Sequence, residues 1–240
     1  SPIVLPGDDL FAVLKRTLPS TILENSVVAI TSKIVALAEN RVEAVQDDNK
    51  SHKHALVRQE AEYYLEPTSS QYGVMLTVKN NILAVNAGID ESNTNGWYVL
   101  WPEDCQSITN TIWQWIRTEY GLENLGVILT DSKTTPLFWG VVGASISHCG
   151  FSALNDKRNT PDIFGREMQM TQVNVAQALA AVAVLEMGET NEQTPVAIVT
   201  NIPEISFVDH HPTEQELSEL KISLQDDVYA PVLTKADWKK

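Results

Sequence analysis

Hydrophobic and polar positions follow one another in short blocks along the chain, and the period of each block predicts a helix or a strand. Apolar residues recur at helical spacing over residues 10–18, behind a Pro6–Asp9 turn whose aspartates can cap a helix. Residues 107–120 gather isoleucine and tryptophan on one face, and Gly121 ends this second helix. Further helices are expected over residues 55–65, 173–187 and 213–220.

Short apolar runs bounded by polar residues are typical of buried strands. Residues 72–88 predict two strands joined at the Lys79-Asn-Asn81 turn. Polar segments over residues 47–54 and 156–165 are expected to be loops. The alternation of strands and helices predicts a mixed α/β fold, and it leaves the strand order open. The other expected strands cover residues 27–30, 127–129, 139–151 and 195–199.

The length of the chain permits one large domain or two small ones. With 240 residues, we expect a core over residues 1–200, which two subdomains can form, and an acidic extension over residues 201–240 packed on it. The longest apolar stretch, residues 173–187, is too short to span a bilayer and contains polar side chains. A buried helix is therefore expected there.

Composition and charge narrow the range of partners. The 31 acidic against 17 basic residues give a formal charge of -14, which argues against a nucleic acid and against an anionic membrane surface. An acidic protein can still bind a nucleoside triphosphate when metal ions offset the repulsion. Cys105 and Cys149 form no metal-binding pair and no disulfide framework, and no signal segment follows Ser1, so a cytoplasmic protein is expected.

The standard catalytic motifs are absent from the sequence. It contains no phosphate loop, no dinucleotide-binding glycine motif, no nucleophile elbow and no zinc-protease helix motif. His148 and Cys149 follow an apolar strand and are expected in the core rather than in catalysis. Any phosphate chemistry must therefore depend on other residues.

Two aspartates after apolar runs are the candidates for that chemistry. Asp90 lies in Asn86-Ala-Gly-Ile-Asp-Glu-Ser-Asn93, and Asp131 lies in Thr130-Asp-Ser132. A carboxylate beside Gly, Ser or Asn at the mouth of a strand can hold a divalent metal against phosphate oxygens. A role in turns is the alternative, because Asp is favoured where strands end. Lys33 has a similar pair of interpretations, a surface lysine or a cation that neutralises a phosphate.

Several segments, in order along nearly the whole chain, resemble the coenzyme F-420-0:γ-glutamyl ligase family. They are Val28-Ala-Ile-Thr-Ser-Lys-Ile34, Asn86–Asn93, Val127-Ile-Leu-Thr-Asp131, Asp162-Ile-Phe-Gly-Arg166 and Met187-Gly-Glu189. Other segments are most similar to a branch described as folate-metabolism γ-glutamate ligases. These are Tyr98-Val-Leu-Trp-Pro102, Thr134–Gly140, Cys149-Gly-Phe151, Asn191-Glu-Gln-Thr-Pro195 and Ile222–Pro231.

The resemblance implies mixed α/β subunits that pair as an intertwined homodimer. It implies an acid–amino-acid ligase that uses GTP or ATP and two divalent ions, Mg²⁺ or Mn²⁺, to add L-glutamate through an acyl phosphate. The branch makes a folate-type acceptor the first expectation, and the deazaflavin acceptor of a true F-420-0:L-glutamate ligase is the alternative. A nucleotide- or metal-binding protein that has lost ligation is the third interpretation.

Residue by residue, the resemblance implies a metal centre and a nucleotide site. The metal ligands would be Asp90 and Asp131 for one ion, with Ser132 and Glu189 helping to hold the second. Asp131 and Lys33 would be the catalytic residues. A turn-capping hydroxyl is the alternative for Ser132. The nucleotide contacts would be Leu5, Pro6, Gly7, Asp8, Ser32, Lys33 and Asn93.

Departures from the family pattern concern the acceptor. Ser132 and the following Lys133-Thr-Thr-Pro136 replace a Thr and a Gly-Arg-Pro-type loop, and Leu37 stands where a basic residue is common. These positions put the identity of the acceptor in question more than the reaction type. Tryptophans can stack on a pterin or flavin ring, or can simply belong to the core or an interface; the candidates are Trp97, Trp101 and Trp139.

Overall fold

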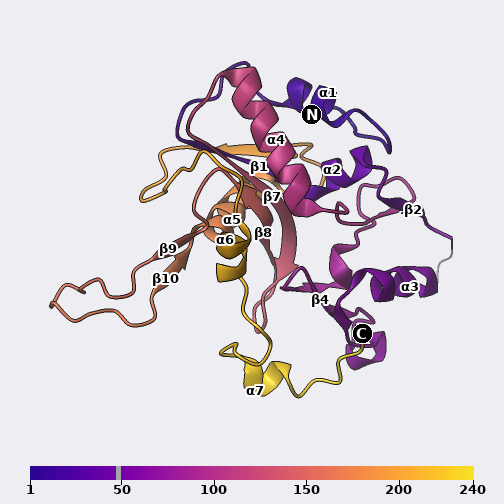
Figure 1. Ribbon diagram of the computed structural model, residues 1–240. Helices are drawn as coiled ribbons and strands as arrows, with labels where there is room; N and C mark the ends of the chain where they lie inside the picture. The colour runs from indigo at the N-terminus through magenta and orange to yellow at the C-terminus, as the bar shows by residue number, and fades with distance from the viewer. Residues whose placement is uncertain (47–49) are drawn as a thin grey trace.

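A four-stranded mixed sheet forms the centre of the computed structural model, which describes residues 1–46 and 50–240 (Figure 1). The strand order is β11-β1-β7-β8, and only β1 and β7 run parallel. β1 is an uninterrupted apolar run because both of its faces are covered. The bounds are β1 (Ser26–Thr31), β7 (Leu125–Thr134), β8 (Val141–Cys149) and β11 (Val196–Val199).

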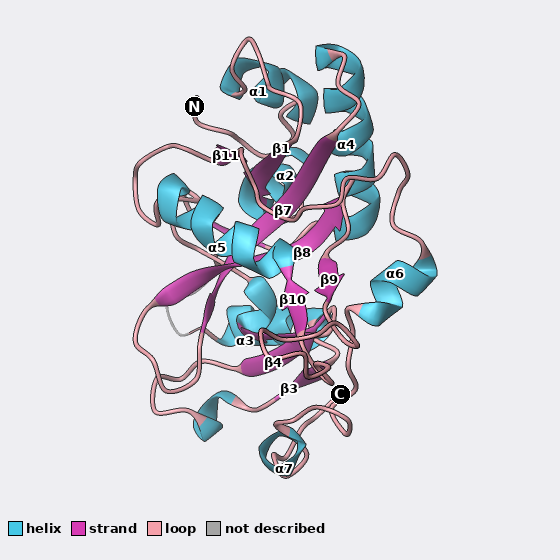
Figure 2. Cartoon of the chain, turned by 90° about the vertical axis from the view of Figure 1, so that its left-hand side faces the viewer, coloured by secondary structure: helices cyan, strands magenta, loops and turns pink. Residues whose placement is uncertain are grey.

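Helices cover both faces of this sheet. Val28 and Ile30 pack with α1 (Leu10–Thr17) and α4 (Cys105–Tyr120), whereas Val27 and Ala29 pack toward α5 (Val175–Met187). Alternate residues of one strand therefore enter two different cores, as the period of a strand requires. Figure 2 shows α5 lying across the sheet, with α4 on the side away from it.

A smaller region lies beside the carboxyl end of β1. Its three-stranded sheet has the order β3-β4-β5, and a two-stranded ladder joins β2 to β6. Met75, Tyr98 and Leu100 form its own core with residues of α3. The elements are α2 (Ser32–Ala38), β2 (Val42–Ala44), α3 (Ser51–Glu60), β3 (Tyr63–Tyr64), η1 (Pro67–Ser69), β4 (Leu76–Lys79), β5 (Ile82–Val85), η2 (Asn86–Gly88) and β6 (Trp97–Val99).

The remaining elements form an arm and a C-terminal segment. β9 (Leu154–Asp156) pairs with β10 (Gln172–Asn174), and the chain between them projects away from the body (Figure 1). After α6 (Glu214–Glu219) and α7 (Ala230–Leu233), the chain returns to the small region, where Lys239 exchanges backbone hydrogen bonds with Tyr64. The division into residues 1–200 and 201–240 stays a prediction.

The expected mixed α/β fold is confirmed, and so are most of its elements. Asp9 caps α1, Gly121 ends α4 in a left-handed conformation, and α5 ends at Gly188 as predicted. The hairpin at Lys79–Asn81 is also present, with Asn80 and Asn81 at positive φ. Over residues 1–46 and 50–240, no helix is long and apolar enough to cross a membrane.

Other boundaries were predicted wrongly. The helix expected over residues 55–65 ends at Glu60, since the chain then enters β3. It begins at Ser51, so residues 51–54 are not the expected loop, and residues 47–49 lie outside the described part of the chain. The polar loop expected over residues 156–165 is confirmed from residue 157 on, where it belongs to the arm, and only its first residue, Asp156, belongs to β9 instead.

Candidate functional site

Parallel pairing of β1 and β7 brings the first two segments of the site together. Thr31 lies opposite Thr130 in the register, so Ser32 and Asp131 follow at neighbouring positions. α2 starts at Ser32, which places Lys33 in its first turn. Asp131 does not end its strand as expected, because β7 continues to Thr134 after a bulge at Leu129/Thr130 and pairs with β8.

Asp90 belongs to the smaller region, and its side chain contacts the start of α2. It follows the η2 turn rather than β5 directly, and it pairs with Val99 of β6 through two backbone hydrogen bonds of 3.0 and 2.8 Å. The Asp90 Oδ2 atom lies 2.6 Å from Lys33 Nζ. The Lys33 ammonium also donates to the carbonyl oxygen of Ser92 at 2.9 Å. The predicted cation and one predicted carboxylate therefore form a direct ion pair.

The carboxylate of Asp90 is held in its charged form. Burial acts to raise its pKa, but the charge and hydrogen bond of Lys33, together with hydrogen bonds from Ser92, lower that pKa overall. The Ser92 amide donates to Asp90 Oδ1 at 2.8 Å, and the Ser92 hydroxyl donates to Oδ2 at 2.8 Å. Asp90 is thus a fixed anion that anchors Lys33.

Asp131 lies in a different electrostatic environment. Its Oδ2 accepts a hydrogen bond of 2.6 Å from the Trp101 indole, and its Oδ1 accepts one of 2.8 Å from the Ser132 amide. Burial, assisted by the negative charge of Asp90, raises the pKa of Asp131 to about 6, although both hydrogen bonds and the Lys33 charge oppose the rise. An additional cation beside Asp131 would favour its ionised form.

The segment after α5 closes the site from the other face of the sheet. The Ser132 hydroxyl donates to Glu189 Oε1 at 2.6 Å, which joins two of the predicted metal ligands. The side-chain amide of Asn93 donates from Nδ2 to the carbonyl oxygen of Thr190 at 2.7 Å. Five predicted residues therefore form one group, which we call the carboxylate centre: Lys33, Asp90, Asp131, Ser132 and Glu189.

The remaining predicted nucleotide contacts are spread along α2. Ser32 is buried at the start of this helix, while Gly7 donates to the carbonyl oxygen of Leu37 near its end, at 2.9 Å. Lys33 and Leu37 lie four residues apart, about 6 Å along the helix axis. Asp8 accepts a hydrogen bond of 2.9 Å from the Leu5 backbone amide. The structure thus places Leu5–Asp8 beside the part of α2 that lies about one turn beyond Lys33.

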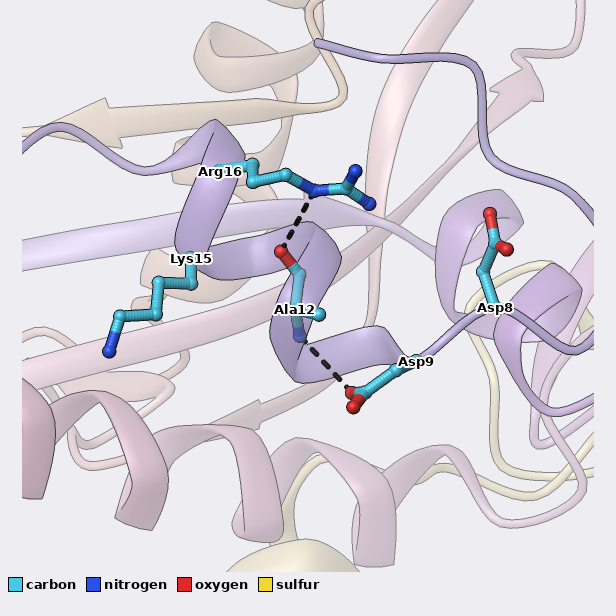
Figure 3. A pocket seen from close by; sticks show the side chains of 5 residues that line it. All are labelled: Asp8, Asp9, Ala12, Lys15 and Arg16. Atoms are coloured by element: carbon cyan, nitrogen blue, oxygen red, sulfur yellow. Dashed lines mark hydrogen bonds between the residues drawn. The ribbon is translucent and has the colours of Figure 1, made fainter.

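Asp8 also lines a surface hollow of about 460 Å³ at the start of α1 (Figure 3). The other lining residues are Asp9, Ala12, Lys15 and Arg16. Asp9 is occupied with capping the helix, because its Oδ1 accepts from the amides of Phe11 and Ala12. Nothing in this hollow belongs to the carboxylate centre.

The donor atoms of the carboxylate centre fit a divalent ion that prefers oxygen ligands. Three carboxylates and one hydroxyl belong to it, and Mg²⁺ and Mn²⁺ both favour oxygen ligands of this kind. Within the described residues, no three His, Cys, Asp or Glu side chains already lie together as a metal site. Instead, Asp90 contacts Lys33 directly, and Glu189 accepts a hydrogen bond from Ser132.

Sequence reasoning did not identify two residues of this site. Ser92 donates two hydrogen bonds to Asp90 and so supports the Asp90–Lys33 pair. In the sequence, only the position of Ser92 two residues after Asp90 indicates this contact. Trp101, a candidate either for stacking on a ligand ring or for the core, is 2% exposed and belongs to the core. Its function in the site is to donate a hydrogen bond to Asp131.

This oxygen-rich centre with a paired lysine, on a mixed α/β fold, can be compared with known proteins. The family of F420-0:gamma-glutamyl ligases matches residues 1–201. The chain therefore belongs to the F420-0:gamma-glutamyl ligase family, which confirms the resemblance seen in the sequence. The expectation of an acid–amino-acid ligase enzyme is confirmed with it.

Relatives from archaea are similar over most of their length. The coenzyme F420:L-glutamate ligase of Methanopyrus kandleri is 30% identical over 216 residues, which cover 84% of each chain. That of Haloarcula marismortui is 32% identical over 235 residues, 89% of this chain and 88% of the relative. These names favour the deazaflavin alternative over the folate-type acceptor that was expected first.

Proposed function

We propose that this chain is a γ-glutamyl ligase that adds L-glutamate to a deazaflavin acceptor of the coenzyme F420 type. The family match and the names of the relatives support the reaction and the acceptor. The structural observation that carries the proposal is the carboxylate centre itself. It combines the Asp90–Lys33 ion pair and the Ser132–Glu189 hydrogen bond with Asp131, whose charge interacts with both Asp90 and Lys33.

The proposed reaction has two steps. A carboxylate oxygen of the acceptor attacks the γ-phosphorus of GTP or ATP, so an acyl C–O–P linkage forms and the bond to the nucleoside diphosphate breaks. The glutamate amine then attacks the acyl carbon, the amide bond forms, orthophosphate leaves and the amine loses a proton. The protein's share is positioning and electrostatic stabilisation, which explains the absence of a nucleophile motif.

The residues have distinct parts in this proposal. Lys33, fixed by Asp90 and Ser92, offsets negative charge on the transferring phosphoryl group. Asp90, Asp131, Ser132 and Glu189 would hold Mg²⁺ or Mn²⁺, which when bound withdraws charge from phosphate oxygens. Asn93 fixes the Asp90 loop to the segment that carries Glu189. Ser32 and the Leu5–Asp8 segment remain the proposed contacts of the nucleotide.

We infer in addition that two copies of the chain pair as a homodimer. The arm between β9 and β10 stands away from the body and exposes Ile163 by 92% and Phe164 by 88% (Figure 1). The tip between β7 and β8 exposes Leu137 and Trp139 as well. Apolar groups of this size on projecting segments favour association, and a second copy offers the same surfaces in return.

Release of orthophosphate by the purified chain tests the proposed ligase activity. The assay contains GTP or ATP, Mg²⁺ or Mn²⁺, L-glutamate and either a deazaflavin acceptor or tetrahydrofolate. We expect release that requires both glutamate and the deazaflavin, with a product heavier by one glutamate residue. Release that requires tetrahydrofolate instead would contradict the proposed acceptor, and nucleotide binding without release would contradict ligation.

The variant Asp131→Ala supplies the matched test of the site. We expect turnover to fall by on the order of 10²–10³-fold while the chain stays folded, because one electrostatic partner of the reaction is removed. Asp237→Ala is the control, since Asp237 forms an exposed ion pair with Lys239 away from both the carboxylate centre and the arm. Near-native turnover of Asp131→Ala would exclude Asp131 from the mechanism.

A further inference from the structure

We propose that Trp101 is the positioning residue of the carboxylate centre, and that it holds Asp131 in the orientation in which Asp131 receives its metal ion. The inference depends on the proposed function through the metal-ligand role of Asp131. It adds a residue that touches neither the phosphate nor the ion. Four contacts of Trp101 carry it.

The first contact is the hydrogen bond itself. Trp101 Nε1 donates to Asp131 Oδ2 at 2.6 Å, and the side chain of Trp101 is almost completely buried. An indole is a donor only, so Oδ2 must act as the acceptor in this pair. The Ser132 amide fixes the other oxygen, Oδ1, at 2.8 Å. The carboxylate plane of Asp131 is therefore set from both ends.

The second contact is the close approach of Gly88 to the indole. A Cβ atom at Gly88 would lie 2.1 Å from Trp101 Nε1 and 2.3 Å from Cε2, and Gly88 has a φ of +72°. Only glycine meets both conditions. Gly88 precedes Asp90 by two residues, so the same indole edge that contacts Asp131 also contacts the segment leading to Asp90. Trp101 thereby fixes the two aspartates relative to each other.

The third and fourth contacts come from two cations. Arg41 Nε donates to the carbonyl oxygen of Trp101 at 3.1 Å, and Lys79 Nζ lies 5.4 Å from the centroid of its ring. Both cations share the carboxylate of Glu60, at 2.9 Å for Arg41 and 2.6 Å for Lys79. This ion group holds the backbone and the ring face of Trp101 at once.

Together these contacts connect the smaller region to the chemistry. Glu60 ends α3 and contacts Lys79 at the end of β4. Lys79 lies over the ring of Trp101, and Trp101 donates to Asp131. Hydrogen-bond partners of metal ligands orient the ligands, and their removal typically weakens metal affinity by about 10–100-fold. The geometry assigns this function to Trp101.

The test compares Trp101→Phe with Trp113→Phe in the full-length chain. Trp113 is the matched control because it is also buried, donates its indole N–H to the carbonyl oxygen of Leu125 at 2.8 Å and has a cation, Arg117, over its ring. Binding of Mn²⁺ alone is measured by electron paramagnetic resonance. We expect Trp101→Phe to raise the Kd for Mn²⁺ by about 10-fold or more and Trp113→Phe to leave it unchanged.

Thermal unfolding and turnover complete the comparison. Both variants are expected to lose similar stability, since each loses one buried hydrogen bond. In the ligase assay, Trp101→Phe raises the Mn²⁺ concentration needed for half-maximal rate and leaves the KM for glutamate unchanged. A general structural defect would change both quantities. Gly88→Ala keeps the indole but displaces it, and it is also expected to raise the Kd for Mn²⁺. This second variant tests the positioning role of Trp101 if Trp101→Phe does not fold.

Two results overturn the inference. In the first, Trp101→Phe or Gly88→Ala binds Mn²⁺ with the same Kd as the native chain. In the second, the native chain binds no Mn²⁺. A native chain that binds Mn²⁺ but forms no amide would contradict the proposed function alone. In that case a weaker Kd in Trp101→Phe still supports the positioning role.

Discussion

Asp90 and Asp131 lie in one centre, yet their pKa values shift in opposite directions. Asp90 has a full cationic partner in Lys33, whereas Asp131 has the neutral donors Trp101 and Ser132 as its direct partners. Burial therefore prevails only at Asp131, where it raises the pKa to about 6. This difference gives the two carboxylates different parts: Asp90 anchors a lysine, and Asp131 is the position that gains most from an added cation.

A buried histidine outside the site makes folding stability depend on pH. Burial lowers the pKa of His148 to about 4, from an ordinary 6.5. Between pH 4 and pH 6.5 the unfolded chain binds a proton at His148 that the folded chain does not, so the free energy of unfolding rises with pH in this range. The contribution of His148 to stability is therefore complete above pH 6.5 and is lost as the pH falls toward 4. The contribution is at most about 3–4 kcal/mol, from roughly 1.4 kcal/mol per pKa unit.

His148→Leu is expected to flatten this dependence. Urea unfolding between pH 4 and pH 7.5 measures it, as the difference between native and variant at each pH. The exposed His211→Leu serves as the control for the loss of one histidine. A difference that stays constant from pH 4 to pH 6.5 would show that His148 does not titrate as its burial requires.

Single residues were predicted from the sequence where a local pattern marks them. Asp90, Asp131 and Lys33 each follow an apolar run, and the structure brings all three together. The two carboxylates lie close enough for their charges to interact, but Asp131 does not end its strand and Asp90 follows a turn rather than a strand. The core alternative for Trp101 is confirmed, but its contact with Asp131 was not predicted, because the two residues lie thirty positions apart and no spacing in the sequence encodes such a pair.

At the scale of elements, the seating of α5 on the sheet decides where Glu189 lies. Gly143 of β8 faces this helix, and a Cβ atom there would lie 2.3 Å from the carbonyl oxygen of Ala180 and 2.5 Å from Val184 Cβ. The helix approaches the strand closely because this position has no side chain. Glu189 follows α5 and reaches Ser132 across the sheet.

Gly143→Ala is therefore expected to lower the free energy of unfolding by about 1–3 kcal/mol, since α5 must move outward. Turnover should fall too, because the displaced helix draws Glu189 away from Ser132. Urea unfolding and the phosphate assay measure the two effects. Val141→Ala, at an exposed position of the same strand, should change stability by no more than about 0.5 kcal/mol. Equal stability of the two variants would contradict the close packing.

Elements with a strong period were predicted well, and those stabilised by distant contacts were not. The helix at residues 107–120 follows directly from its apolar face, and the helix at residues 173–187 follows from its long apolar stretch. β7 was predicted too short, because its polar half, Asp131–Thr134, is held by pairing with β8 rather than by burial. The start of α3 was missed because Lys53 is buried beside Tyr98, against the polarity of its segment.

At the scale of the whole molecule, the exposed apolar residues favour the pairing of two copies of the chain. Ile163 and Phe164 occupy the arm between β9 and β10, far from the core of their own chain (Figure 1). Their exposure is costly in water unless another surface covers them. Because the arm projects beyond the body, a second copy can cover it where the chain itself cannot.

The paired change Ile163→Ser with Phe164→Ser tests this assembly. We expect sedimentation to show a dimer for the native chain and a monomer, or a dimer with Kd raised at least 100-fold, for the double variant. This loss corresponds to removing two buried apolar side chains of about 1.5–3 kcal/mol each. Val228→Ser, which alters an equally exposed residue of the C-terminal segment, should leave the dimer intact. A native chain that sediments as a monomer, or a double variant that dimerises as the native chain does, would exclude the arm as the contact between copies.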